Sequence, residues 1–457
     1  MDTGLQVRRV RSMVTIGLLF AMFAPLSTIS LHAVQAPPDG RAMGEQPWPM
    51  LARSLVGVQV ACPIGASECA RYRELLVLSD AQRMFFDGLH EQYLDRCQAL
   101  EVERAPKMLE MAEEFQVSLG QRTRDRVFVN ANSRWLSMEA DFNKRIASLD
   151  EQLFAQLEVA LSEEQETAMP RVRMHRDRSR VMPPRWFGTP KSVIDLSAMI
   201  DELAIIGDPT EQLDSVRWSY EQAFTPVLIK ATSLHLANRE GIETARFRQR
   251  FDEQGTALDR TVPGVMDRLR EIGAQINEMY AAQGREQLRL AAMNDEYLIM
   301  LANAMPASEA EKLQATYRHF VYWRVFPDHA DPQDLVAGMI GHPAISAELN
   351  AVIRGHWDAY RSKYDELNAA LVRESDAWDL GHALTAASNG WKRHIAAMTE
   401  LASKRLVLNE AIVQTIVPLL PGEVSEHRRI AISDWREIVA SDRQTINEPA
   451  WQAYSQR

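Results

Sequence analysis

The stretch LDEQLFAQLEVALSEEQ, residues 149–165, has a pattern that returns twice further along the chain. It recurs as MNDEYLIMLANAMPASE from Met293 and as LNEAIVQTIVPLLPGEV from Leu408. In each copy an apolar residue precedes Asp or Asn and then an acid, and apolar residues follow four, eight and twelve positions on. This spacing is typical of one face of an amphipathic helix. The Asp or Asn of each copy is predicted to cap the start of that helix: Asp150, Asn294 and Asn409.

The rest of the chain also follows helical spacing. Each copy is predicted to end at a capping or helix-breaking residue: Ser162, Pro306 or Pro421. A second echo links ISAELNAVIRGHWDAY from Ile345 to LSDAQRMFFDGLHEQY from Leu78, with a Tyr fifteen residues after the first position in both. No run alternates with period two between Gly or Asn turns. The sequence therefore predicts an all-α fold of two or three diverged helical hairpin or bundle units with long amphipathic helices.

Breaks rich in Pro and Gly divide the chain into predicted units. The first helical unit covers residues 67–190 and ends in MPPRWFGTPK. The second covers 191–332 and the third 333–457. Before them, residues 37–66 are predicted to be a Pro/Gly-rich linker.

The N-terminus, residues 1–36, has the features of a targeting segment. Three arginines precede an apolar run from Met13 to Leu26, and the segment ends in small residues at Ala33 and Ala36. This order is typical of a signal peptide, and it predicts export to the periplasm or cell envelope. Retention of the segment as a single membrane anchor is the alternative, because the run is near the lower length limit of a span.

The overall charge bears on the class of partner. The chain has 457 residues and a formal net charge of −11. A surface that follows phosphates needs a basic excess, so the composition argues against a nucleic-acid-binding protein. The densest basic run is predicted either to bind an anion through its guanidinium groups or to pair with acidic residues of neighbouring helices. Its arginines are Arg171, Arg173, Arg176, Arg178, Arg180 and Arg185.

Three cysteines are consistent with export. Cys62 and Cys69 flank a Pro and a Gly, which favour a turn, so a disulfide between them is predicted in an oxidising compartment. Cys97 is predicted to be a small buried apolar residue.

The sequence contains no motif typical of catalysis or metal binding. It has no HExxH pair, no paired Glu-x-x-His motifs, no GxSxG elbow, no Gly-rich phosphate loop and no SxxK. We therefore predict neither a metal nor a cofactor and expect a protein without catalytic activity. An enzyme whose site is assembled from separate helices is the alternative, and it would require carboxylates or histidines that converge in a deep pocket.

Two short motifs resemble those of a known family. Leu78-Ser79-Asp80-Ala81-Gln82 and Leu161-Ser162-Glu163-Glu164-Gln165 are similar to the LTxxQ motif of the Spy/CpxP family of periplasmic helical proteins, with Ser in place of Thr. The same residues have the spacing of a helix capping box. The resemblance implies an all-α hairpin fold and chaperone-like binding of unfolded envelope proteins. We thus predict a binding or scaffold protein of the cell envelope, with a protein partner, and an anion-binding protein as the alternative.

Overall fold

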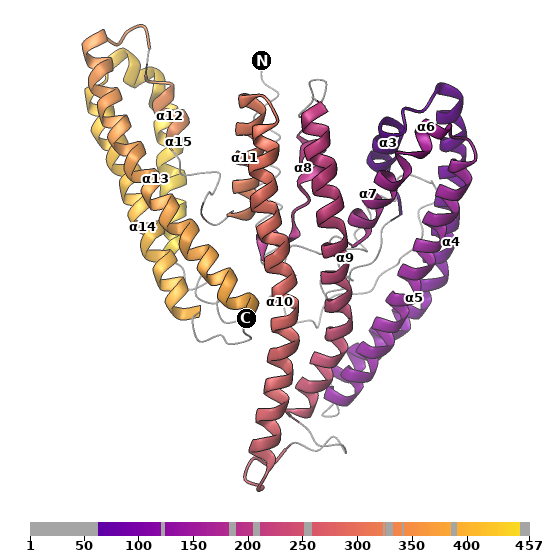
Figure 1. Cartoon of the computed structure of the whole chain (residues 1–457). Coiled ribbons are helices and arrows are strands. Elements are labelled where there is room, and N and C mark those ends of the chain that lie inside the picture. The colour runs from indigo at the N-terminus through magenta and orange to yellow at the C-terminus, as the bar shows by residue number, and fades with distance from the viewer. Residues whose placement is uncertain are drawn as a thin grey trace. The chain divides into compact units, whose positions relative to one another are not determined.

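A computed structural model of the chain describes residues 63–119, 124–181, 189–203, 211–250, 258–322, 325, 332–340, 342–384 and 391–447. These residues form helices joined by turns, with no strand among them, which confirms the predicted all-α fold (Figure 1). Within these ranges, no helix has the length and apolarity that crossing a bilayer requires. The predicted signal segment and Cys62 lie outside the described residues, as does the linker up to residue 62. The predictions of export and of a disulfide stay predictions.

Long helices that follow one another in the chain pack side by side (Figure 1). The first helix pair consists of α4 (Asp80–Leu119) and α5 (Arg124–Glu158). The second consists of α9 (Glu211–Arg248) and α10 (Val265–Asn303). The third consists of α13 (Ala347–Leu384) and α14 (Trp391–Ile416). Contacts of α5 with α9 and of α10 with α13 connect neighbouring pairs.

Further helices flank each pair. Around the first pair they are α3 (Ala66–Leu75), α6 (Glu163–Glu166) and α7 (Met169–Val181). Around the second pair they are η2 (Pro190–Val193), α8 (Leu196–Glu202) and α11 (Ala307–Val321). Around the third pair they are α12 (Gln333–Ala337), η4 (Val417–Leu419) and α15 (Gly422–Asn447).

The buried apolar residues form separate clusters that follow these groups of helices. One cluster extends from Ile64 to Val172, and another contains Leu335 and Val439 at its ends in the sequence. The cluster between them, built mainly on α8, α9 and α11, also includes Leu371 of α13 and Met398 of α14. The third helix pair therefore contributes to the core of the second. The predicted unit boundaries at residues 190 and 332 stay predictions.

A tyrosine and an Asp or Asn join the two helices of each pair. The Tyr93 hydroxyl donates to Asp150 Oδ1 at 2.8 Å, Tyr220 to Asn294 Oδ1 at 3.0 Å, and Tyr360 to Asn409 Oδ1 at 2.9 Å. All six side chains are buried. Burial raises the pKa of the Tyr93 and Tyr220 hydroxyls, which therefore remain protonated donors at neutral pH.

These contacts correct the predicted role of the recurring Asp or Asn. Asp150, Asn294 and Asn409 lie inside α5, α10 and α14, so they do not cap a helix start. Each Asp or Asn was expected at a helix start, because free backbone N–H groups occur in the first turn of a helix and not in its interior. The free partner is instead a hydroxyl on the adjacent helix, which no local spacing shows.

Candidate functional site

The two LSxxQ motifs meet at one end of the first helix pair. Gln82 Nε2 donates to Gln165 Oε1 at 2.8 Å, and Gln165 Nε2 donates to Gln82 Oε1 at 3.1 Å. Each glutamine also accepts a bond from the backbone N–H of its own motif serine, Ser79 at 2.9 Å and Ser162 at 3.0 Å. Both motifs are therefore capping boxes, as the spacing predicts, and the two boxes are joined to each other.

The same amide groups hold the two turns that precede the serines. Gln82 Nε2 donates to the Ala160 carbonyl at 2.8 Å, and Gln165 Nε2 donates to the carbonyls of Leu76 at 3.0 Å and Val77 at 3.2 Å. Val77 has a φ of 47°, in the left-handed region that a β-branched residue rarely adopts. The glutamine pair therefore keeps the turn at Val77 in a backbone conformation of high energy.

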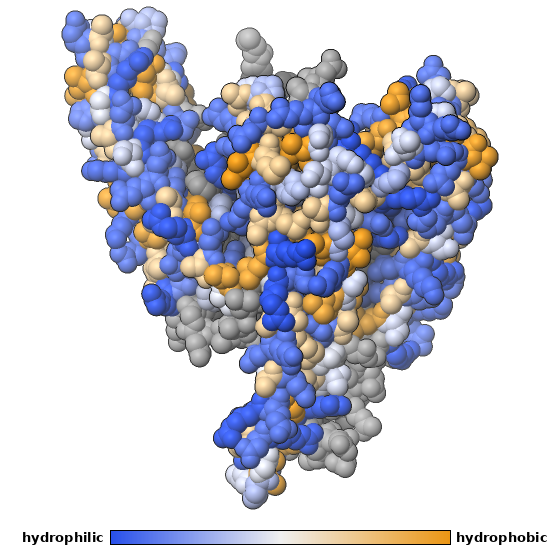
Figure 2. Space-filling view, viewed as in Figure 1, coloured by the Kyte–Doolittle hydropathy of each residue, from blue (hydrophilic) through white to orange (hydrophobic). Residues whose placement is uncertain are grey.

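Apolar side chains around this glutamine pair are exposed. Val77 is 78% exposed, and Val159, which precedes Ala160, is 87% exposed. Met84 and Phe85, in the second turn of α4, are 77% and 45% exposed. We call these four residues the apolar tip. Figure 2 shows apolar residues at the surface of this end of the first helix pair, near α4 and α6. Clusters of exposed apolar side chains are typical of binding surfaces, which makes the apolar tip the candidate site.

Acidic side chains surround the apolar tip. Those exposed to solvent are Glu74, Asp80, Glu163, Glu164 and Glu166. A cleft of about 340 Å³ adjoins the tip between α3 and α4, and its lining carries charges of both signs. Its residues are Ala70, Arg73, Glu74, Arg83 and Asp87. Glu74 and Asp80 pair with Arg71 and Arg83 at 3.2 and 3.6 Å, so the excess of negative charge near the tip lies on α6.

The predicted basic run lies on α7, and part of it faces the first helix pair. Arg176 is 2% exposed and donates from Nε to Asp150 Oδ2 at 2.8 Å. Burial alone would lower the pKa of the Arg176 guanidinium, but Asp150 and Glu68 outweigh this effect and raise it. Arg173 bonds Glu158 at 2.9 Å. Arg180 lies 3.5 Å from Asp150 and 2.7 Å from Asp177.

Two other arginines of α7 face α8 and α9. Arg178 is 1% exposed and donates to Asp195 Oδ2 at 2.7 Å. Burial alone would raise the pKa of the Asp195 carboxyl, but Arg178 outweighs it and lowers this pKa. Arg171 bonds Asp214 at 2.7 Å and Glu221 at 2.8 Å. The five described arginines of the run thus have carboxylate partners within the chain, which favours pairing with neighbouring helices over anion binding. Arg185 lies outside the described residues.

The described cysteines are buried thiols. Cys69 is 1% exposed, and burial raises the pKa of its thiol to about 12. Cys97 is also inaccessible, and burial raises the pKa of its thiol to about 11. A thiol with such a pKa is almost entirely protonated at neutral pH and reacts slowly.

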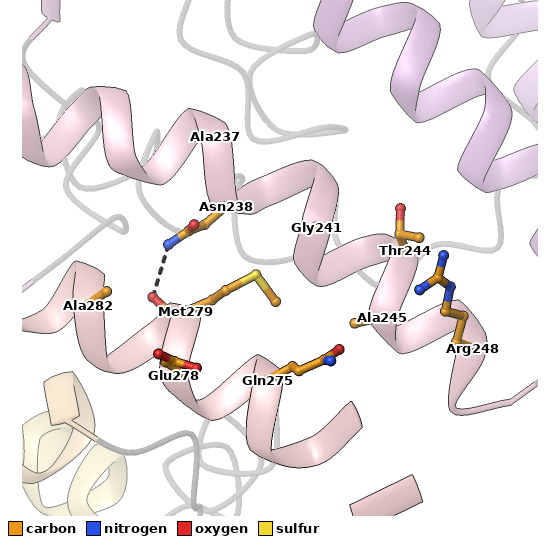
Figure 3. Close-up of a pocket in the computed structure, with 10 residues that line it drawn as sticks. All are labelled: Ala237, Asn238, Gly241, Thr244, Ala245, Arg248, Gln275, Glu278, Met279 and Ala282. Atoms are coloured by element: carbon orange, nitrogen blue, oxygen red, sulfur yellow. Dashed lines mark hydrogen bonds between the residues drawn. The ribbon is translucent and has the colours of Figure 1, made fainter. Parts of the chain in front are cut away.

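A larger pocket, of about 690 Å³, lies between α9 and α10 (Figure 3). Small side chains on the facing helices leave this space, and a Cβ at Gly241 would lie 3.1 Å from Met279 Sδ. The Asn238 side chain bonds the Met279 carbonyl at 3.0 Å. Arg248 and Glu278 are the charged residues of the lining. Among the described residues of this lining, Glu278 is the one carboxylate, whereas the enzyme alternative requires several that converge.

Carboxylates do converge where the second and third helix pairs meet. Lys191 Nζ lies 2.8 Å from Asp295 and 3.2 Å from Asp376. Tyr317 donates to Asp295 at 3.0 Å, and Tyr322 donates to Asp376 at 3.0 Å. Burial alone would lower the pKa of the Lys191 ammonium, but Asp295 and Tyr322 outweigh this effect and raise it, so Lys191 stays charged and joins the helices.

Within the described ranges, no group of three or more His, Cys, Asp and Glu side chains is placed to hold a metal ion. No family model matches the sequence, and comparison with curated proteins and with solved structures finds no significant match. The resemblance of the two LSxxQ motifs to the Spy/CpxP family stays an expectation. The exposure of the apolar tip could not be predicted, because apolar residues next to a capping box usually pack against its helix.

Proposed function

We propose that this protein is a non-catalytic binding protein of the cell envelope that holds unfolded polypeptide segments at the apolar tip. The observation that carries the proposal is the exposure of Val77, Met84, Phe85 and Val159 around the joined pair of Gln82 and Gln165. The cell-envelope location rests on the predicted signal segment at residues 1–36.

Rigidity of the tip supports a binding role. The glutamine amides hold both turns through backbone carbonyls, so the exposed side chains need not lose much backbone freedom on binding. Strain at Val77 is maintained by the same bonds. Such strain occurs mainly where the local conformation is needed for function.

The acidic surroundings indicate the chemistry of the segment that binds. Glu163, Glu164 and Glu166 lie on the short helix α6, which begins directly after Ser162, the serine of the second LSxxQ motif. Segments that carry Lys or Arg next to Leu, Ile or Phe would gain contacts with both the apolar tip and its acidic surroundings. Acidic segments would be repelled. The function is therefore capture of basic, apolar stretches that a folded protein would bury.

A labelled peptide tests the proposal. The probe is a fluorescein-labelled 16-residue peptide with four Leu and four Lys separated by Gly and Ser, and binding is followed by fluorescence anisotropy. Burial of one Val side chain contributes about 1.5 kcal/mol, which corresponds to roughly tenfold in Kd. We expect Val159→Ser to weaken binding about tenfold. Replacing the four Lys of the peptide by Glu should abolish it.

Val102→Ser is the matched control, since Val102 is 67% exposed on α4 but lies far along the helix from the glutamine pair. This variant should bind the peptide as the wild type does. Equal loss in both variants, or equal binding of the Lys and Glu peptides, would refute the proposed site.

A further inference from the structure

Met84 is the most exposed methionine among those whose side chains the structure describes. Its exposed fraction is 77%, against 48% for Met266 and 39% for Met300. Methionines of the buried clusters, such as Met169 and Met398, are each 3% exposed. A core thioether is shielded from solutes, whereas the Met84 side chain is accessible to small reagents in the solvent.

Met84 belongs to the apolar tip. It lies on α4 two residues after Gln82 and directly before Phe85, which is also exposed. The other three residues of the tip are valine and phenylalanine, so Met84 is the one tip residue that contains sulfur. Oxidation of its thioether adds a polar group to the tip, while the bonds between Gln82 and Gln165 involve no sulfur and stay in place.

The described thiols do not compete with Met84 for an oxidant. Cys69 and Cys97 are buried, and burial raises the pKa of their thiols to about 12 and about 11. A peroxide attacks the thiolate, so both groups react slowly at neutral pH. A thioether has no acidic proton, and its reactivity depends mainly on access. Within the described part of the chain, an oxidant therefore acts first on the exposed methionines.

We propose that Met84 is an oxidation site through which hydroperoxides weaken binding at the apolar tip. The inference rests on the function proposed above. A hydroperoxide transfers one oxygen atom to the Met84 sulfur: the O–O bond breaks, an S–O bond forms, the sulfur loses two electrons, and hydrogen peroxide is reduced to water. The sulfoxide is polar, and an apolar segment that covers it must remove its water. The oxidised protein therefore releases segments that the reduced protein holds.

Fluorescence anisotropy with the Leu/Lys peptide tests the inference. The Kd is measured on the full chain before treatment with hydrogen peroxide and again after the peroxide has been removed. Loss of one apolar side-chain contact corresponds to roughly tenfold in Kd, so we expect the wild-type Kd to rise about tenfold. Methionine sulfoxide reductases of both epimer specificities, with a thiol, should restore the original Kd.

Two variants locate the effect. Met84→Leu has an apolar side chain without sulfur, so peroxide should leave the Kd of this variant unchanged, whatever its value before treatment. Met266→Leu is the control, because Met266 is exposed on α10 and does not belong to the apolar tip. Peroxide should raise the Kd of this control as it does for the wild type.

Three results would overturn the oxidation site. They are an equal rise of Kd in the wild type and Met84→Leu, no added oxygen on Met84 by mass spectrometry, and a constant wild-type Kd although Met84 carries the oxygen. In each case the untreated wild type still binds the peptide, so the proposed function stands. If the untreated wild type does not bind the peptide, the proposed function fails and the oxidation site fails with it.

Discussion

Replacing Asp150 by asparagine should destabilise the first helix pair strongly, although asparagine occupies the matched position in the other two pairs. Asp150 is 1% exposed and accepts from Tyr93 at 2.8 Å and from Arg176 at 2.8 and 3.2 Å. An asparagine retains the bond to Tyr93 but leaves the buried Arg176 without its main counter-charge. Removing one partner of a buried ion pair costs about 3–5 kcal/mol.

The lower end of this range applies here. Glu68 lies 3.4 Å from Arg176 and still provides a negative charge in the variant. We therefore expect Asp150→Asn to lower the free energy of unfolding by about 3 kcal/mol. Urea unfolding followed by circular dichroism measures the loss, and hydrogen–deuterium exchange locates it. Exchange should rise in α4, α5 and α7 and stay unchanged in α13 and α14.

The third helix pair indicates how the loss can be recovered. Arg176 lies 26 residues after Asp150, and the residue 26 after Asn409 is Trp435, which is buried. Replacing a buried ion pair by neutral residues of similar volume is often close to neutral for stability. Asp150→Asn with Arg176→Met should therefore regain most of the stability. The exposed Asp95→Asn is the control and should change the free energy of unfolding by less than about 0.5 kcal/mol. If Asp150→Asn costs less than about 1 kcal/mol, or the double variant is less stable than the single one, the reasoning is wrong.

Three further predictions concern the glutamine pair, the strained turn and one histidine. Gln82→Ala should lower the free energy of unfolding by about 2 kcal/mol, because the Ala160 carbonyl and the Ser79 backbone N–H lose their Gln82 partner. Gln82→Leu with Gln165→Val should cost less than the single change, because the same distances from Tyr360 and Asn409 are occupied by Leu349 and Val424 in the third pair; urea unfolding checks both. Val77→Gly should stabilise the turn by roughly 1 kcal/mol because glycine adopts a φ of 47° without strain, and a lower urea midpoint than the wild type would contradict this. Burial, with the charge of Arg239, lowers the pKa of His235 to about 4 in the folded protein. The neutral form is favoured by folding, so this contribution to stability is complete above the unfolded pKa of about 6.5 and is lost as the pH falls towards 4. The urea midpoint should fall over this interval, and less so in His235→Gln; identical pH profiles for the two proteins would exclude this assignment.

Local sequence pattern was sufficient for the fold class and for the capping boxes. Ser79 and Ser162 each bond the glutamine three residues on, as the spacing predicts, because a capping box involves only neighbouring residues. The apolar repeat after Asp150 was also interpreted correctly, since Leu153 and Leu157 are buried.

Longer-range features could not be predicted in the same way. The end of α4 at Leu119 and the start of α5 at Arg124 are one such feature. Helical periodicity continues across this interval, and Gly120 is its one sequence signal for a helix end. The partners of Asp150 come from α4 and α7, which lie 57 and 26 residues away in the sequence. Only the repeat of Tyr93 and Tyr360 in matching echoes gave a signal of this contact.

Tyr93 bonds an aspartate, whereas Tyr220 and Tyr360 bond asparagines. This difference affects which helices pair while the chain folds. Three similar helix pairs on one chain can mispair while they fold, since α5 could meet the tyrosine of α9 or α13. In such a product Asp150 would face a tyrosine but bury its charge away from Arg176, whereas Asn294 and Asn409 carry no charge. Pairing of α5 with α9 or α13 is therefore less stable than pairing with α4, because it separates Asp150 from Arg176. We expect the ion pair to favour the correct pairing of α5 with α4 during folding.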